Sequence, residues 1–315
     1  MSAFPREVTI FEVGARDGLQ NEAQQVPVNT KAWFIDGLAK TGLREIEIGA
    51  FVRSDRVPQM ADTDELYKML REGRLLHKSK ARAWSLIPNL KGLERAQEAG
   101  AKNLAVFIGV TDSFTRANVG KSVAEQLAEF KPMIAQARKA KLTVRGYLST
   151  AFGCPFEGVV AAKKTLTVAG KLFDLGVQQV SIGDTIGVAV PRGKGGVDEV
   201  VKPALRKWGS KNIALHFHDT RGTALANALR ALELGVKTLD SSAGGLGGCP
   251  FAPGATGNLA TEDLVYMLHQ MGVKTGVNLE ALCQLSAEMA KRMGRPISSR
   301  YLMAWLKSCK TPSKS

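Results

Sequence analysis

The stretch Asn212–Leu239, NIALHFHDTRGTALANALRALELGVKTL, contains one complete strand–helix–strand pattern. It begins with a short apolar run, Asn212–Phe217, continues with an amphipathic segment, Thr223–Leu234, and ends with a second short run, Val236–Leu239. Gly235 stands between the last two segments, where glycine commonly ends a helix in the left-handed conformation. Two strands joined by a helix with short connections predict a parallel pair with a right-handed crossover.

The same alternation extends over most of the 315 residues. We predict strands at Val8–Val13, Arg44–Ile48, Ala81–Leu86, Asn103–Ile108, Thr143–Leu148, Gln179–Ile182, Asn212–Phe217 and Val236–Leu239. We predict helices between them at Thr30–Lys40, Leu90–Ala99, Val123–Lys139, Ala161–Leu175, Val197–Trp208 and Thr223–Leu234. Eight such units favour an α/β fold of the closed (β/α)8 TIM-barrel type over an open doubly wound sheet. No G-x-G-x-x-G sequence follows the first strand, which weakens a dinucleotide-binding interpretation.

The last quarter of the chain departs from this alternation. The segments Thr261–Met271 and Leu279–Met293 are too short for a second core, and we expect extra C-terminal helices that cover one barrel end. We therefore predict a single domain with the barrel at about 7–258, a helical extension at about 259–305 and a basic tail at 306–315.

The composition is that of an ordinary globular protein. Apolar residues make up 44% of the chain and charged residues 23%, which argues against a disordered or collagen-like chain. No apolar run approaches the roughly 20 residues of a membrane helix, so we expect no membrane partner. The four cysteines include no C-x-x-C pair, and the N-terminus carries no export signal. Both observations predict a reducing, cytoplasmic location.

The formal net charge is +14, and half of this excess lies in residues 291–315, which contain seven Lys or Arg and no acid. A solvated C-terminal tail explains such a block. Attraction of a polyanionic substrate is a second interpretation. A basic nucleic-acid-binding protein is a third, but the chain has no nucleic-acid-binding motif, and we expect no nucleic-acid partner.

Candidate metal ligands gather where barrel strands end. The loops at the C-terminal ends of the strands form the active site of a TIM barrel. His216 and His218 share a strand face because residues i and i+2 point the same way, so both can reach one metal ion. Asp17 is the natural third ligand, unless it only caps the turn with Gly18. Asn258 could add an amide oxygen or mark a helix start. This set suits Mg²⁺ or Mn²⁺ better than Zn²⁺.

Further polar residues fall at the same rim. A buried arginine at a barrel mouth needs a partner or a function. Arg16 could stabilise a developing enolate or clamp a carboxylate, or it could form a structural ion pair with Glu47. Arg145 and Tyr147 on the fifth strand and Asp184 after the sixth are candidates for substrate binding.

The segment Gly244–Gly257 is rich in glycine and contains Cys249. A loop of this length at the catalytic rim is a candidate lid. The thiol of Cys249 could donate a proton, although a single cysteine is as readily an inert small apolar residue.

Several of these stretches resemble the 3-hydroxy-3-methylglutaryl-CoA lyases, which belong to a superfamily of metal-dependent lyase and Claisen-condensing barrels. The matching stretches are EVGARDGLQNE (12–22), VPQM (57–60), PNLKG (88–92), VRGY (144–147), GCPFEG (153–158), SIGDTIG (181–187), HFHDT (216–220) and SSAGGLGGCPFAPGATGNLATEDLVYML (241–268). The run GLGGCP separates this family from the homocitrate- and isopropylmalate-type synthases, which share the Arg-Asp-Gly and His-x-His elements.

The resemblance implies a divalent-metal-dependent cleavage of (S)-3-hydroxy-3-methylglutaryl-CoA to acetyl-CoA and acetoacetate, in leucine degradation and ketone-body metabolism. It also implies an acyl-CoA as the small-molecule partner and a homodimer as the assembly. The implied metal ligands, for Mg²⁺ or Mn²⁺, are Asp17, His216, His218 and Asn258.

The resemblance further implies a role for each remaining candidate. Arg16 stabilises the enolate, Cys249 serves in proton transfer, and Glu47 and Asp184 are acids of the site, while Asp17 or a histidine such as His216 takes the hydroxyl proton. The chain departs from the family at a few positions such as Ala15 and Ala50, which leaves the acyl group open. The alternatives are a lyase for a related 3-hydroxy-3-methyl acyl-CoA, and a Claisen-type synthase or aldolase of the same superfamily.

Overall fold

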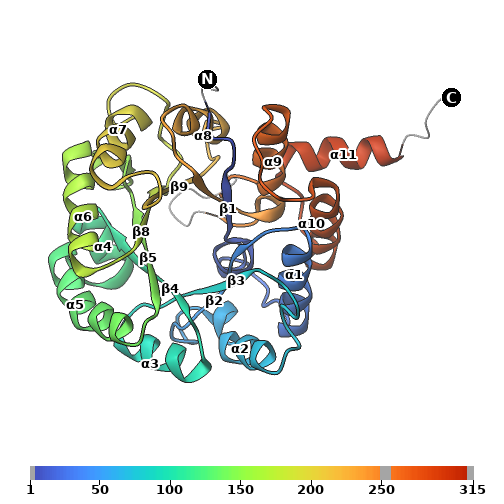
Figure 1. Cartoon of the computed structure of the whole chain (residues 1–315), viewed down its shortest axis with the longest axis horizontal. Helices are drawn as coiled ribbons and strands as arrows, with labels where there is room; N and C mark the ends of the chain where they lie inside the picture. Colours follow the sequence, from blue (N-terminus) through green and yellow to red (C-terminus); the bar gives the residue numbers. More distant parts are fainter. Residues whose placement is uncertain (1–3, 249–256, 311–315) are drawn as a thin grey trace.

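The structure is a computed structural model that describes residues 4–248 and 257–310. Within these ranges, eight parallel strands close into a barrel in the order β1-β10-β9-β8-β5-β4-β3-β2, with helices outside it (Figure 1). The strands are β1 (Thr9–Glu12), β2 (Glu45–Ala50), β3 (Arg82–Leu86), β4 (Asn103–Gly109), β5 (Thr143–Ser149), β8 (Gln179–Asp184), β9 (Ile213–Phe217) and β10 (Thr238–Ser241). The predicted TIM barrel is confirmed.

Burial on both faces explains why these strands are apolar. All six residues of β2 are buried, because one face packs against the helices and the other fills the barrel. The longest registered pairing joins β4 to β5, from Asn103 opposite Thr143 to Gly109 opposite Ser149. Charged residues inside such strands, among them Glu47 on β2, are therefore buried and need partners.

The helices follow the strands in the expected order. They are α1 (Val28–Lys40), α2 (Thr63–Arg71), α3 (Leu90–Ala99), α4 (Asp112–Val119), α5 (Val123–Lys139), α6 (Ala162–Leu175), α7 (Val197–Trp208), α8 (Ala224–Glu233), α9 (Thr261–Gln270), α10 (Leu279–Met293) and α11 (Arg300–Lys310). Gly235 directly follows the last turn of α8 with a φ of +98°, the left-handed conformation that its position predicted.

Some elements were not predicted. The helices α2 and α4 have nine and eight residues, near the lower limit of roughly 8–20 for a globular helix. The helix α11 begins within the predicted helical extension and continues into the predicted basic tail. A two-stranded hairpin, β6 (Gly153–Cys154) with β7 (Gly158–Val159), also escaped notice because each strand has only two residues.

The C-terminal extension reaches both the outer layer and the mouth of the barrel. The helix α10 packs beside α1 in the outer layer (Figure 1). The hydroxyl of Ser298, between α10 and α11, lies 3.0 and 2.9 Å from the carbonyl oxygens of Gly244 and Gly245 at the mouth. In the described part of the chain, no helix combines the length and apolar character needed to cross a membrane.

Candidate active site

A π-helical turn at the end of β1 brings two charged residues to the barrel mouth. The turn, η1, spans Gly14–Gly18. The amides of Arg16 and Asp17 lie 3.1 and 2.8 Å from the carbonyl oxygen of Val13, which fixes the tight path of the backbone. The side chains of Arg16 and Asp17 are therefore attached to a backbone that hydrogen bonds hold in place. A preorganised site requires such a rigid backbone.

The buried carboxylate of Glu12 connects this turn to the loop after β10. Its Oε1 accepts hydrogen bonds from the amides of Gly14 at 2.8 Å and Ala243 at 2.9 Å, and its Oε2 accepts one from the hydroxyl of Thr261 at 2.6 Å. Ala243 begins the short 3₁₀ turn η3, Ala243–Gly245. The first and last strands of the barrel are thus joined at the mouth, where the ligand candidates lie.

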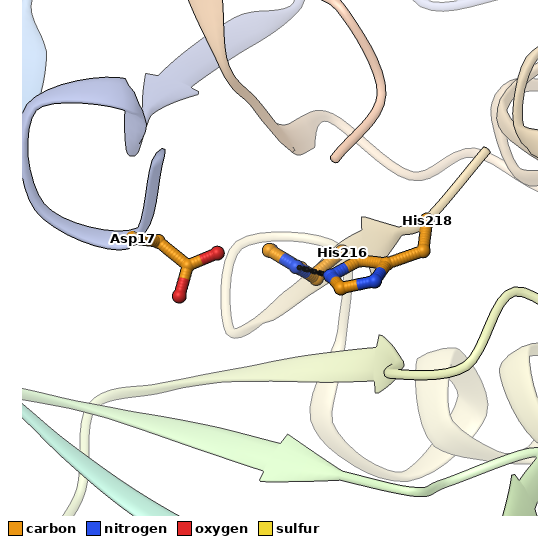
Figure 2. A group of neighbouring side chains, drawn as sticks. All are labelled: Asp17, His216 and His218. Carbon is orange, nitrogen blue, oxygen red and sulfur yellow. Dashed lines mark hydrogen bonds between the residues drawn. The ribbon is translucent and has the colours of Figure 1, made fainter. Parts of the chain in front are cut away.

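The structure brings Asp17, His216 and His218 together. One ligand atom from each of these residues lies within 4.8 Å of the others, and Figure 2 shows the Asp17 carboxylate pointing toward the imidazole pair. The Nε2 atoms of the two histidines face each other at 3.1 Å. Three potential ligands from opposite ends of the chain therefore converge on one point.

Asn258 joins this group through a short bridge. The backbone of Asn258 pairs with that of His218, and its Nδ2 lies 2.8 Å from Oδ2 of Asp17. Gly247 makes room for it: its φ is +125°, and a Cβ at this position would lie only 2.6 Å from the Asn258 amide nitrogen. A side chain at residue 247 would therefore displace Asn258.

The protonation states in the cluster fit a bound cation. Burial opposes charge on Asp17, but the neighbouring guanidinium of Arg16 is the main opposing cause, and the pKa of this carboxyl is lowered to about 2. Burial lowers the pKa of His218 to about 3, so its imidazole is neutral near pH 7. Metal ligands must be in these deprotonated forms. One carboxylate, two imidazoles and an amide make a donor set that accepts a divalent cation.

Unsatisfied atoms support the same interpretation. Nδ1 of His218 and Oδ1 of Asn258 are buried without a hydrogen-bond partner among the described residues. Buried polar atoms in a native protein are nearly always satisfied, and an unsatisfied group often marks an ion or water site. The described cluster therefore has unused bonding capacity.

Arg16 is held by two carboxylates. Its Nε donates to Oε2 of Glu47 at 2.7 Å, and its Nη1 donates to Oδ1 of Asp17 at 2.7 Å. The hydroxyl of Tyr147 donates to the same Glu47 oxygen at 3.0 Å. Burial opposes the charge of the guanidinium, yet the two ion pairs outweigh it and raise the pKa of Arg16. Arg16 thus has the predicted partner Glu47 and also lines the cavity.

The three other substrate-binding candidates have different positions. Tyr147 lines the cavity, as a substrate contact would. Arg145 and Asp184 are fully buried and are absent from the cavity lining. Arg145 pairs with Asp240, and Asp184 accepts two backbone amides of the loop after β8, each at 2.9 Å. In the described structure both side chains are therefore held by protein groups outside the cavity lining, and their contact with substrate stays a prediction.

A cavity of about 270 Å³ opens at the C-terminal ends of the strands. One side is polar and includes Arg16, Asp17, Tyr147, Ser149, His216 and His218. The other side is apolar and includes Val52, Leu86, Pro88, Phe107, Phe114 and Val119. A substrate with an oxygen-rich end and a hydrocarbon part fits this division.

Some residues at the site were missed by the sequence analysis. Glu12 is a buried acid within the predicted strand Val8–Val13, and Asp240 is a buried acid directly after the predicted strand Val236–Leu239. An acid at such a position in or beside an apolar strand is a signal that could have found them. Phe107 and Phe114 gave no signal, because aromatic residues are equally expected in the core. Cys249 lies outside the described residues.

This geometry defines a class of protein: a TIM-barrel enzyme with a candidate divalent-metal site at the C-terminal ends of its strands. Comparison with known families then gives the particular family. The HMGL-like family model matches residues 7–289. The chain belongs to this family, and its full-length relatives named hydroxymethylglutaryl-CoA lyases identify it as a carbon–carbon lyase.

Similar proteins share nearly the whole chain. The hydroxymethylglutaryl-CoA lyase YngG of Bacillus subtilis is 44% identical over 306 residues, which are 97% of this chain and 99% of the relative. A crystal structure of hydroxymethylglutaryl-CoA lyase from Pseudomonas aeruginosa matches with a TM-score of 0.92 at 38% identity, covering 97% of this chain and 99% of that one. A structure from Acinetobacter baumannii, in complex with coenzyme A and 3-methylmalate, matches with a TM-score of 0.88 at 36% identity, covering 100% and 99%.

Proposed function

We propose that this protein cleaves 3-hydroxy-3-methylglutaryl-CoA to acetyl-CoA and acetoacetate. The observation that carries the proposal is the convergence of Arg16 with Asp17, His216 and His218 on one cavity. Such a cleavage needs one group that accepts the hydroxyl proton and another that stabilises the thioester enolate. The full-length similarity to hydroxymethylglutaryl-CoA lyases supports the same reaction.

The cation that we propose is Mg²⁺ or Mn²⁺, held by Asp17, His216, His218 and Asn258. Carboxylate, imidazole and amide donors in this proportion favour these ions over the thiolate-rich sites of Zn²⁺. When bound, such a cation lowers the pKa of a nearby alcohol and stabilises an oxyanion.

The chain's own residues perform the proton and charge transfers. A base of the cluster, Asp17 or His216, removes the proton from the C3 hydroxyl. The C2–C3 bond then breaks, C3 becomes the ketone of acetoacetate, and the electron pair passes into the thioester enolate. Protonation of the enolate carbon gives acetyl-CoA, and we assign this proton to Cys249 from the family resemblance.

Arg16 is placed to stabilise the enolate. A guanidinium has five N–H donors, and those on Nε, Nη1 and Nη2 that meet Glu47 and Asp17 leave others for a ligand. Because the two carboxylates fix the guanidinium, it needs no reorganisation when the negative charge develops. A donor fixed in this way stabilises the transition state more than the ground state.

Further proposals concern the setting of the reaction. The apolar side of the cavity would take the hydrocarbon part of the acyl-CoA, and a related 3-hydroxy-3-methyl acyl chain is an alternative substrate. A cytoplasmic homodimer, a role in leucine degradation and the absence of nucleic-acid or membrane partners stay predictions. The relatives include proteins named as mitochondrial as well as bacterial ones.

A product assay tests the proposal. Purified protein with Mn²⁺ is given a panel of branched 3-hydroxyacyl-CoA thioesters, with and without a chelator, and acetyl-CoA and the ketone product are measured. Metal-dependent release of acetoacetate supports the proposed reaction. No cleavage, together with condensation of acetyl-CoA with a 2-oxo acid, would instead support a synthase of the same superfamily.

A further inference from the structure

Asp240, at the end of β10, is a buried carboxylate next to one of the proposed metal ligands. We propose that Asp240 is a positioning residue that fixes the tautomer and the orientation of His216, so that Nε2 of this imidazole is presented to the cation. This inference rests on the proposed metal site, and the experiments below distinguish a failure of the inference from a failure of the metal site.

The backbone places the two side chains together. Asp240 and His216 are register partners on the adjacent strands β10 and β9. Nδ1 of His216 lies 3.4 Å from Oδ2 of Asp240, while Nε2 of the same ring points at the cluster. The ring thus has one nitrogen toward a carboxylate and the other toward the proposed cation, the arrangement that fixes a ligand imidazole.

The carboxylate of Asp240 cannot turn away from this ring. Arg145 donates from Nη2 to Oδ1 of Asp240, and the hydroxyl of Ser181 donates to Oδ2 at 2.6 Å. Arg145 is itself fixed, because it is fully buried and its guanidinium lies 3.7 Å from the centre of the Phe11 ring. Both oxygens of Asp240 are therefore held in place by side chains from the inside of the barrel.

The tautomer of His216 follows from this contact. An ionised carboxylate only accepts hydrogen bonds, so a ring proton of His216 belongs on Nδ1, facing Asp240. Nε2 is then the atom with the free lone pair. Nδ1 of both rings lacks a hydrogen bond in the described part of the chain, but Nδ1 of His216 lies 3.4 Å from the Asp240 carboxylate. With its Nδ1 turned toward Asp240, His216 presents Nε2 to the cluster.

The same buried network extends from Asp240 to Arg16. Nη1 of Arg145 lies 3.4 Å from the hydroxyl of Tyr147, which donates to Glu47, and Glu47 holds Arg16. The buried Arg145 therefore has a supporting function, because its guanidinium holds the Asp240 carboxylate in place.

The substitution Asp240→Asn tests the inference, because asparagine has nearly the same size and shape as aspartate but carries an NH₂ group in place of one oxygen. Arg145 only donates, so the amide oxygen of the new side chain should stay on the Arg145 side, and the NH₂ group should face Nδ1 of His216. A donor at this position favours the tautomer with the proton on Nε2, which removes the lone pair from the proposed cation. We expect the affinity for Mn²⁺, measured by calorimetry without substrate, to fall 10- to 100-fold.

A second measurement needs no variant. Nitrogen-15 NMR of the metal-free wild-type protein reports which ring nitrogen carries the proton, and the chain has only four histidines to assign. We expect the proton of His216 on Nδ1 in the wild type, and on Nε2 in Asp240→Asn. Asp263→Asn is the control, because this buried carboxylate accepts hydrogen bonds from the amides of Arg300 and Tyr301 at the start of α11. It should leave the Mn²⁺ affinity within about threefold of the wild type.

The outcomes are distinguishable. A wild-type His216 with its proton on Nε2 would overturn the inference, and this result does not depend on whether Asp240→Asn folds. A folded Asp240→Asn protein that binds Mn²⁺ as tightly as the wild type would overturn it as well. If the wild type itself binds no Mn²⁺, the metal site proposed above fails, whereas the NMR spectrum still decides the tautomer.

Discussion

Arg16 and Glu47 form a buried ion pair in which Nε and Nη2 of the guanidinium meet a single carboxylate oxygen, Oε2, at 2.7 and 2.6 Å. The second oxygen, Oε1, has no partner among the described residues. Burial raises the pKa of Glu47, and Arg16 opposes this shift. The pair therefore fixes the direction of the guanidinium while one carboxylate oxygen stays unused.

The first prediction concerns Arg16→Ala. This change removes the fixed donor for the enolate, so the turnover number should fall by roughly 10²–10³ or more. Arg16→Lys should recover little, because an ammonium group cannot reproduce the planar fork that meets both Glu47 and Asp17. Steady-state kinetics on protein with an unchanged circular dichroism spectrum check this. Near-normal turnover in Arg16→Ala would show that the enolate is stabilised elsewhere.

The second prediction concerns Glu47→Gln. This substitution keeps the shape of the side chain but leaves the positive charge of Arg16 with only Asp17 as a partner. Removing one member of a buried ion pair costs about 3–5 kcal/mol, so urea unfolding should show a loss of this order. The guanidinium, now held by Asp17 alone, can also rotate, and turnover should fall with little change in KM. A variant as stable and active as the wild type would contradict the assigned contact.

The third prediction concerns the ligands. Asp17→Asn and His218→Ala should each abolish measurable binding of Mn²⁺ in calorimetry and also the response of the activity to added metal, because each removes a donor from the cluster. His77→Ala changes a histidine in the segment between α2 and β3, far from the cluster in the sequence, and serves as the control. Retained affinity in both ligand variants would refute the ligand assignment.

The barrel could be predicted from the sequence because the strand–helix pattern repeats along the chain. Each predicted strand is a short apolar run bounded by a helix and often a glycine, and all eight runs form strands of the barrel in the described structure. His216 and His218 could be paired for a similar reason, since strand alternation alone puts them on one face. Local periodicity is sufficient for both conclusions.

Other features depend on tertiary contacts that the sequence does not express. The positions of Arg145 and Asp184 at the rim suggested substrate contact, yet whether a side chain at a strand end points into the mouth or below it depends on the barrel's closure and register. The buried network around Asp240 likewise joins strands that are distant in sequence, β5 and β10. The spacing of residues in the sequence could predict neither the orientation of Arg145 and Asp184 nor the network around Asp240.

The fourth prediction concerns the apolar side of the cavity. Phe107 lies at the carboxyl end of β4, and its ring centre is 6.3 Å from that of Phe114 on α4. Phe107→Ala should enlarge the space for the acyl group and raise the preference for a 3-ethyl over a 3-methyl substrate about tenfold, since one methylene in an apolar pocket changes binding by roughly 1–3 kcal/mol. The ratio of kcat/KM for the two thioesters measures this preference.

Phe173→Ala is the control, because it removes a ring that stacks on Trp208 and should leave the ratio unchanged. An unaltered ratio in Phe107→Ala would place the acyl group elsewhere.

The last prediction links stability to pH through Glu262, at the start of α9. Both of its carboxyl oxygens lie 2.9 Å from the amide of Gly244, and burial raises its pKa from 4.5 to about 8. The folded state therefore holds this proton more tightly than the unfolded state does. The stabilisation is complete below pH 4.5 and is lost as pH rises toward 8, at about 1.4 kcal/mol for each pKa unit.

In urea unfolding at pH 5 to 8, the wild type should lose several kcal/mol of unfolding free energy relative to Glu262→Gln, whose amide does not titrate. Glu280→Gln changes an exposed glutamate on α10 and controls for the substitution itself. Parallel stability curves for the wild type and Glu262→Gln would show that this carboxyl is ionised in the folded protein throughout the range, and that the amide of Gly244 offsets its burial.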